Sequence, residues 1–105
     1  MKEQEEVLES LTLIGNHFSI PNNELILSEN TYESLEKRIS SIVGHLLDKD
    51  MNRLLNSLYR IDVDEMKFKK ILTEEPPENL SRRIAQEIIR RELQKVKTRE
   101  KYKNF

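Results

Sequence analysis

Apolar residues recur at three- and four-residue steps along most of this chain, which is the spacing that places them on one face of an α-helix. The first row predicts a helix over about residues 3–15 or a little beyond, with Gly15 and Asn16 as a candidate stop and His17 in a loop. This row consists of Val7, Leu8, Leu11, Ile14 and Phe18.

A short apolar run at residues 24–27 follows a segment of turn-forming residues. It is a candidate extended segment, but a lone strand needs a partner and the chain offers no second convincing strand. The sequence therefore leaves open whether residues 24–27 form a strand.

The clearest helical pattern predicts a helix over residues 31–47. Asn30 and Glu33 have the spacing of a capping box, in which two side chains satisfy backbone N–H groups at a helix start. The apolar stripe of this helix consists of Tyr32, Leu35, Ile39, Ile42, Val43, Leu46 and Leu47.

Two more caps divide the middle of the chain into shorter helices. Asp50 predicts the start of a helix over residues 51–60, and Asp62 with Glu65 repeats the capping arrangement for a helix over residues 63–73. In the first of these helices, one side is expected to carry Met51, Leu54, Leu55, Leu58 and Ile61.

The last predicted helix covers residues 77–98 and starts at Pro77 or Glu78, because proline is tolerated at the first helical position. Its apolar residues cover more than half of the circumference, so we expect a central helix that packs on several elements of its own chain or against a second subunit. These residues are Leu80, Ile84, Ala85, Ile88, Ile89, Leu93 and Val96. Residues 99–105 are expected to form a frayed basic tail.

These patterns predict an all-α fold, a small bundle of four to five helices in one domain that spans residues 1–105. The chain has 105 residues, enough for one core, and its two glycines and three prolines leave long runs of helix-forming residues uninterrupted. The absence of cysteine excludes disulfides and sulfur-based zinc sites. An acidic N-terminus and the lack of a bilayer-length apolar run predict a cytoplasmic protein that does not enter a membrane.

The acidic residues near Asp48 begin a calcium-loop spacing that the following residues do not complete. Asp48, Asp50 and Asn52 match the first three ligand positions of an EF-hand, but Arg53 stands where a glycine is needed and Tyr59 where a bidentate glutamate is needed. We therefore expect no metal site.

Motifs for catalysis or cofactor binding are also missing. His17 and His45 lack the paired spacing of a zinc site, and Gly15 and Gly44 lie too far apart for a phosphate-binding loop. The sequence predicts no catalytic residue, no cofactor and no enzymatic activity.

Basic residues gather near the C-terminus, namely Arg90, Arg91, Lys95, Lys97, Arg99, Lys101 and Lys103. They are candidate phosphate contacts of a nucleic-acid-associated protein, with Tyr102 and Phe105 available to stack on unpaired bases. Cations at a helix C-terminus also complement the helix dipole, and the calculated pI of about 6.2 favours that interpretation. Nucleic-acid binding stays the alternative.

The preferred hypothesis is a non-enzymatic protein-interaction module that self-associates as a homodimer. Residues 1–50 hold ten acidic and four basic side chains (−6) and residues 51–105 nine and fourteen (+5), so two halves of one fold, or two copies, attract each other. Arg60 is expected to form a local ion pair with Asp62 or Asp64. The candidate interface residues are Tyr59, Arg60, Ile84, Ile88, Ile89, Leu93 and Val96.

The run Leu58-Tyr59-Arg60-Ile61-Asp62-Val63, preceded by residues 52–55 and followed later by residues 85–90, resembles an L-Y-R-[IL]-D-V signature of small uncharacterised bacterial helical proteins. The resemblance covers about the C-terminal half of the chain. It implies a bacterial cytoplasmic origin and a helical fold, and it transfers no active-site residue.

Overall fold

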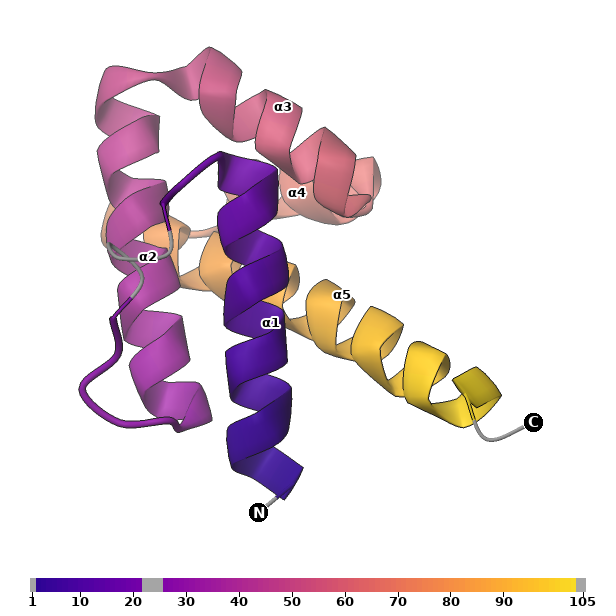
Figure 1. The fold of residues 1–105 in the computed structure, drawn as a ribbon. Helices are drawn as coiled ribbons and strands as arrows, with labels where there is room; N and C mark the ends of the chain where they lie inside the picture. Colours follow the sequence, from indigo (N-terminus) through magenta and orange to yellow (C-terminus); the bar gives the residue numbers. More distant parts are fainter. Residues whose placement is uncertain (1, 22–25, 104–105) are drawn as a thin grey trace.

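The chain folds as a small all-α bundle, as its sequence pattern predicts (Figure 1). The computed structural model describes residues 2–21 and 26–103. Its elements are α1 (Lys2–Phe18), α2 (Tyr32–Lys49), α3 (Met51–Ile61), α4 (Glu65–Glu74), a 3₁₀ turn (Pro77–Asn79) and α5 (Leu80–Lys103). Of the candidate extended segment, residues 24 and 25 lie outside the described residues, and residues 26 and 27 have no regular secondary structure.

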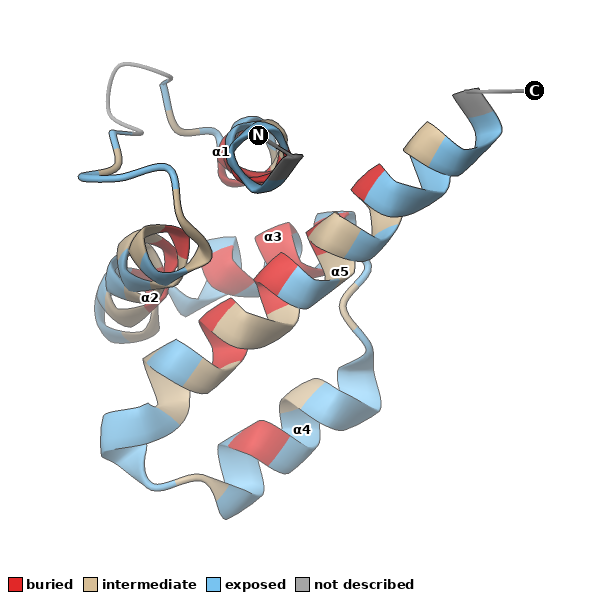
Figure 2. Ribbon diagram, turned by 90° about the horizontal axis from the view of Figure 1, so that it is seen from below, coloured by how far each residue is buried: buried red, intermediate tan, exposed pale blue. Residues whose placement is uncertain are grey.

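Helix α5 is the central element, because it packs against each of the other four helices. Figure 2 shows its buried residues along the middle of the helix, with α4 on one side and α1, α2 and α3 on the other. The expectation that this helix packs on several elements of its own chain is confirmed. The helix also continues to Lys103, beyond its predicted end at residue 98.

One continuous core joins the helices. Helices α1, α2, α3 and α5 each contribute several buried apolar residues, whereas Ile71 is the one buried residue of α4. The buried residues of this core are Val7, Leu11, Ile14, Phe18, Leu35, Ile39, Val43, Leu46, Leu54, Leu58, Ile61, Ile71, Ile84, Ala85, Ile88 and Ile89.

Helix α1 continues past the candidate stop at Gly15 and Asn16 to Phe18, so the predicted loop position of His17 is wrong. The N–H of Ile20 bonds to the carbonyl of Gly15 at 2.9 Å, and Ser19 has the left-handed φ of 56°. This pattern is a Schellman motif with serine where glycine is usual. Burial of Phe18, which is 1% exposed, draws the last turn into the core and makes His17 helical.

The predicted cap of α2 is displaced by one residue. The side chain of Thr31, not that of Asn30, accepts the N–H of Ser34 at 3.2 Å. Both residue types cap helices well, so the sequence pattern alone does not choose between neighbours. The predicted cap of α3 is confirmed, since Asp50 accepts the N–H of Arg53 at 3.1 Å.

Asp62 does not cap α4 as predicted. It ends α3 in a second Schellman motif, with a left-handed φ of 67° and the N–H of Val63 bonded to the carbonyl of Leu58 at 3.1 Å. Asp64 is the cap of α4 and accepts the N–H of Met66 at 2.8 Å. Two closely spaced aspartates thus divide the tasks of ending one helix and starting the next.

Candidate protein-interaction surface

Helix α3 carries an apolar stripe that the fold does not cover. The sequence places Met51 and Leu55 on the same side as Leu54 and Leu58, but the structure buries only the latter two with Ile61. Met51, Leu55 and the neighbouring Tyr59 follow one another at four-residue steps and are exposed, with Tyr59 at 83%. Four-residue steps place side chains on one face of a helix, so these three form a stripe of their own on the surface.

The stripe opens into a groove between α3 and α4 with a volume of about 410 Å³. Its walls are mainly apolar, and three carboxylates stand at the turn that joins the two helices. We call this surface the α3–α4 groove, and its lining residues are Leu55, Leu58, Tyr59, Asp62, Val63, Asp64, Glu65 and Phe68. An apolar groove with a charged rim has the composition of a protein-binding surface.

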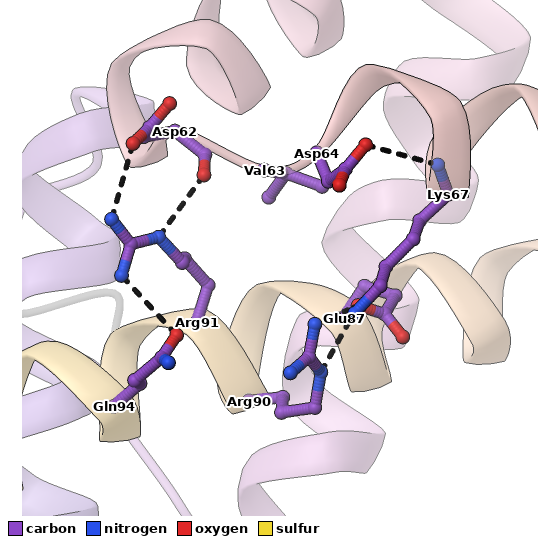
Figure 3. Close-up of a pocket in the computed structure, with 8 residues that line it drawn as sticks. All are labelled: Asp62, Val63, Asp64, Lys67, Glu87, Arg90, Arg91 and Gln94. Atoms are coloured by element: carbon purple, nitrogen blue, oxygen red, sulfur yellow. Dashed lines mark hydrogen bonds and ion pairs between the residues drawn. The ribbon is translucent and has the colours of Figure 1, made fainter.

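A second hollow of about 470 Å³ lies on the other side of the same turn, between it and α5 (Figure 3). Its lining is strongly charged, and its two arginines have acidic or amide partners. Figure 3 shows the guanidinium of Arg91 directed at Asp62 and that of Arg90 directed at Glu87. Both arginines of the hollow are therefore engaged in contacts within the chain.

Arg91 holds the end of α3 in place. Its Nε donates to the backbone carbonyl of Asp62 at 3.1 Å, and its Nη2 donates to the carboxylate of the same residue at 3.1 Å. Arg53 does the same at the end of α1, where its Nη2 donates to the carbonyls of Phe18 and Ser19. In both places an arginine satisfies carbonyl groups that a helix end leaves without an intrahelical partner.

The basic residues predicted to contact nucleic acid are mostly engaged within the chain. The described ion pairs join Arg90 to Glu87 at 3.0 Å, Arg91 to Asp62 at 3.1 Å, Lys95 to Glu92 at 3.2 Å and Arg99 to Glu9 at 3.1 Å. Lys97 and Lys101 are exposed, and the side chain of Lys103 lies outside the described part.

The predicted interface residues divide into two groups. Ile84, Ile88, Ile89 and Val96 are buried within a single chain, so they are not available to a second copy, and Leu93 is partly buried against the core. Tyr59 and Arg60 are exposed on α3. No local ion pair is described for Arg60. The two aspartates expected to pair with it have other partners, since Asp62 pairs with Arg91 and Asp64 caps α4. The wide apolar face of α5 meets its own chain. On the exposed stripe of α3, sequence reasoning named Tyr59 as an interface residue but missed Met51 and Leu55.

Helix α5 also carries a fully buried carboxylate, Glu92. One of its oxygens lies 3.2 Å from Lys95 Nζ and 3.3 Å from His17 Nε2. Burial lowers the pKa of His17 below its ordinary value, the charges of Lys95 and Arg60 lower it further, and Glu92 opposes this shift. The carboxylate of Glu92 therefore joins α5 to the last turn of α1.

A second buried carboxylate, Glu6 of α1, accepts a hydrogen bond of 2.7 Å from the hydroxyl of Tyr32. This bond raises the pKa of Tyr32 to about 12, because losing the proton would place two negative charges in contact. The pair joins the N-terminal part of α1 to the first residue of α2 and serves packing. His45 is exposed and borders a separate hollow of about 350 Å³ beside Arg53 and Phe18.

Within the described ranges, no three side chains of the metal-binding types gather where they would hold an ion. None of the helices there has the length and apolar character needed to cross a bilayer. No protein-family model matches the chain, and no curated protein or solved structure matches it either. The resemblance of residues 52–65 and 85–90 to small bacterial helical proteins thus stays a prediction.

Proposed function

We propose that this protein is a non-enzymatic protein-interaction module of the cytoplasm that self-associates as a homodimer through the α3–α4 groove. The observation that carries the proposal is the exposed stripe of Met51, Leu55 and Tyr59, which opens into that groove. Met66 and Leu72 of the neighbouring α4 are exposed as well. Covering such a patch removes apolar surface from water, which is the main favourable term in association.

Tyr59 is the expected energetic centre of the interface. Tyrosine is enriched among residues that dominate binding energies, and this side chain is 83% exposed beside a preformed hollow. Leu55, one turn away on the same face, supplies the neighbouring apolar contact.

Nucleic-acid association is disfavoured as the alternative by the ion pairs of α5. Arg90, Arg91, Lys95 and Arg99 each have a carboxylate partner within the chain, and each would have to leave it to contact a phosphate. Lys97 and Lys101 alone offer few phosphate contacts.

Size exclusion with light scattering, recorded at 260 and 280 nm over a concentration series, tests both functions. We expect a dimer with a protein-like spectrum for the wild type and a monomer for the Leu55→Asp, Tyr59→Asp double variant. Leu8→Asp is the matched control, because Leu8 is an exposed leucine of α1 away from the groove. A wild-type monomer, or a double variant that still dimerises, contradicts the proposed function, and excess absorbance at 260 nm favours the nucleic-acid alternative.

A further inference from the structure

We infer that the occupant of the α3–α4 groove is the C-terminal end of α5 from a second copy of this chain. The inference rests on the proposed self-association and names the segment that fills the groove. That segment, residues 97–103, is called the projecting end below. Its position, its charge and its aromatic residue each support the assignment.

The projecting end leaves the bundle. Val96 is the last buried residue in the described part of α5, and the helix continues to Lys103. Figures 1 and 2 show this end leading away from the other helices. At a rise of 1.5 Å per residue it extends about 10 Å. A described ion pair joins this end to the bundle, between Arg99 and Glu9 of α1.

The projecting end carries exposed cations, and the α3–α4 groove carries carboxylates. Lys97 and Lys101 are exposed one helical turn apart on the projecting end, and no ion pair is described for either. The groove has the carboxylates of Asp62, Asp64 and Glu65 at its rim. Asp62 also pairs with Arg91 and Asp64 caps α4, so Glu65 is the rim carboxylate for which no contact within the chain is described. A cationic row on one copy therefore faces an anionic rim on the other, which sets the orientation of the two surfaces as they meet.

Tyr102 is the apolar anchor of the projecting end. Its side chain is 67% exposed and follows Lys101 directly, so the helix end has an aromatic group beside its cationic row. The groove has apolar walls that include Leu55, Val63 and Phe68, and its volume of about 410 Å³ accommodates a tyrosine side chain. Insertion of one helix face into an apolar groove is a recurrent mode of protein recognition.

Two copies can each place their projecting end in the groove of the other, so the assembly is complete as a dimer. Each chain has one groove and one projecting end, and α5 leads away from its own bundle, so the two surfaces meet between chains (Figure 1). A twofold arrangement places each end in the groove of the other copy and satisfies both contacts at once. Two equivalent contacts double the area that one contact buries.

The first experiment compares dimer dissociation constants of three variants by light scattering and analytical ultracentrifugation. The groove variant is Leu55→Asp with Tyr59→Asp, and the end variant is Lys97→Gln, Lys101→Gln and Tyr102→Ala. The control is Lys37→Gln with Lys49→Gln on α2, which removes the same charge from exposed positions elsewhere. We expect the groove and end variants to raise the dissociation constant by about 100-fold or more, as hot-spot truncations do, and the control to leave it unchanged.

The outcomes separate the two proposals. An end variant that dimerises like the wild type, beside a monomeric groove variant, overturns this inference and leaves the proposed function standing. A wild type that stays monomeric overturns both.

Cysteine cross-linking gives a second measurement, since the native chain contains no cysteine. Equimolar Glu65→Cys and Lys101→Cys chains should form a disulfide-linked heterodimer under mild oxidation. Lys37→Cys mixed with Lys101→Cys should not. Equal yields from both mixtures overturn the assignment of the groove to the projecting end, even if the variants above fold poorly.

Discussion

Ser19 and Asp62 are the residues with a left-handed backbone among those described outside glycine. Each follows a helix that would ordinarily end at glycine, and each costs backbone energy because its Cβ crowds the neighbouring carbonyl. An arginine from a distant helix bonds to the carbonyl of each residue, Arg53 at Ser19 and Arg91 at Asp62. In both places the group that stabilises the helix end comes from elsewhere in the chain, so a local sequence pattern does not reveal it.

Ser19→Gly should raise the free energy of unfolding by about 0.5 kcal/mol, because relief of the left-handed backbone outweighs the added entropy of the unfolded chain. Chemical denaturation measures the change. Asp62→Gly is the informative comparison, since it relieves the same backbone but removes the carboxylate that pairs with Arg91. A destabilised Ser19→Gly variant would argue against the left-handed turn.

His17 predicts a pH dependence of stability. Its pKa is lowered in the folded chain, so between that value and the ordinary value of about 6.5 the unfolded chain binds more protons. The contribution is complete above about pH 6.5 and is lost as the pH falls through the folded pKa. Relative to His17→Gln, the wild type should therefore lose stability between pH 7.5 and pH 5.5 in urea titrations. A relative gain would show that the imidazolium form is stabilised by Glu92.

At the scale of elements, the spacing of apolar residues predicts the helices well but not which stripes they bury. On α3 the sequence offers two adjacent apolar rows, and α5 and its neighbours cover only the row that contains Leu54, Leu58 and Ile61. The four neighbouring helices cover the broad apolar face of α5. The apolar surface that stays exposed for a partner therefore lies on α3. Close approach of helices also depends on single positions, such as Gly44 of α2 opposite Ser81 of α5.

Gly44→Ala tests this approach. A Cβ at residue 44 would lie 3.0 Å from Ser81 Oγ but 3.7 Å from its Cβ, so the hydroxyl is the obstacle. In a Ser81→Ala background the substitution should stabilise the protein by about 1 kcal/mol through helix propensity, and in the wild type by less. Denaturation of the wild type, both single variants and the double variant measures the coupling. An equal gain in both backgrounds would mean that α2 and α5 lie farther apart at this point.

At the scale of the whole molecule, the charge asymmetry of the two halves is met inside the fold. Arg99 pairs with Glu9 at 3.1 Å and Arg82 lies 3.9 Å from Glu36, so cations of the second half meet anions of the first. Buried apolar residues are unevenly distributed among the five helices. Helix α4 packs mainly on α5 and buries Ile71 alone, which makes it the least anchored of the five helices.

Native-state hydrogen exchange should therefore show α4 opening before the rest of the molecule, because a segment with few buried apolar contacts separates at low free-energy cost. Amides of α4 should exchange faster than those of α2 and of the middle of α5 under conditions that favour folding. Occupation of the α3–α4 groove by a second copy should slow this exchange as protein concentration rises. Uniform protection of all five helices would contradict the ranking.

The sequence by itself determined the all-α class, the approximate extent of each helix and the cap at Asp50, because helix periodicity and capping depend on residues within a few positions of one another. The tertiary structure decided which apolar stripe stays exposed and which carboxylates the basic side chains of α5 pair with. Arg91 meets a partner 29 residues away and Arg99 one 90 residues away, and no local pattern encodes such pairings. Exposure of a stripe likewise depends on which helices cover it, so only the packed fold shows that Met51 and Leu55 lie on the surface beside Tyr59.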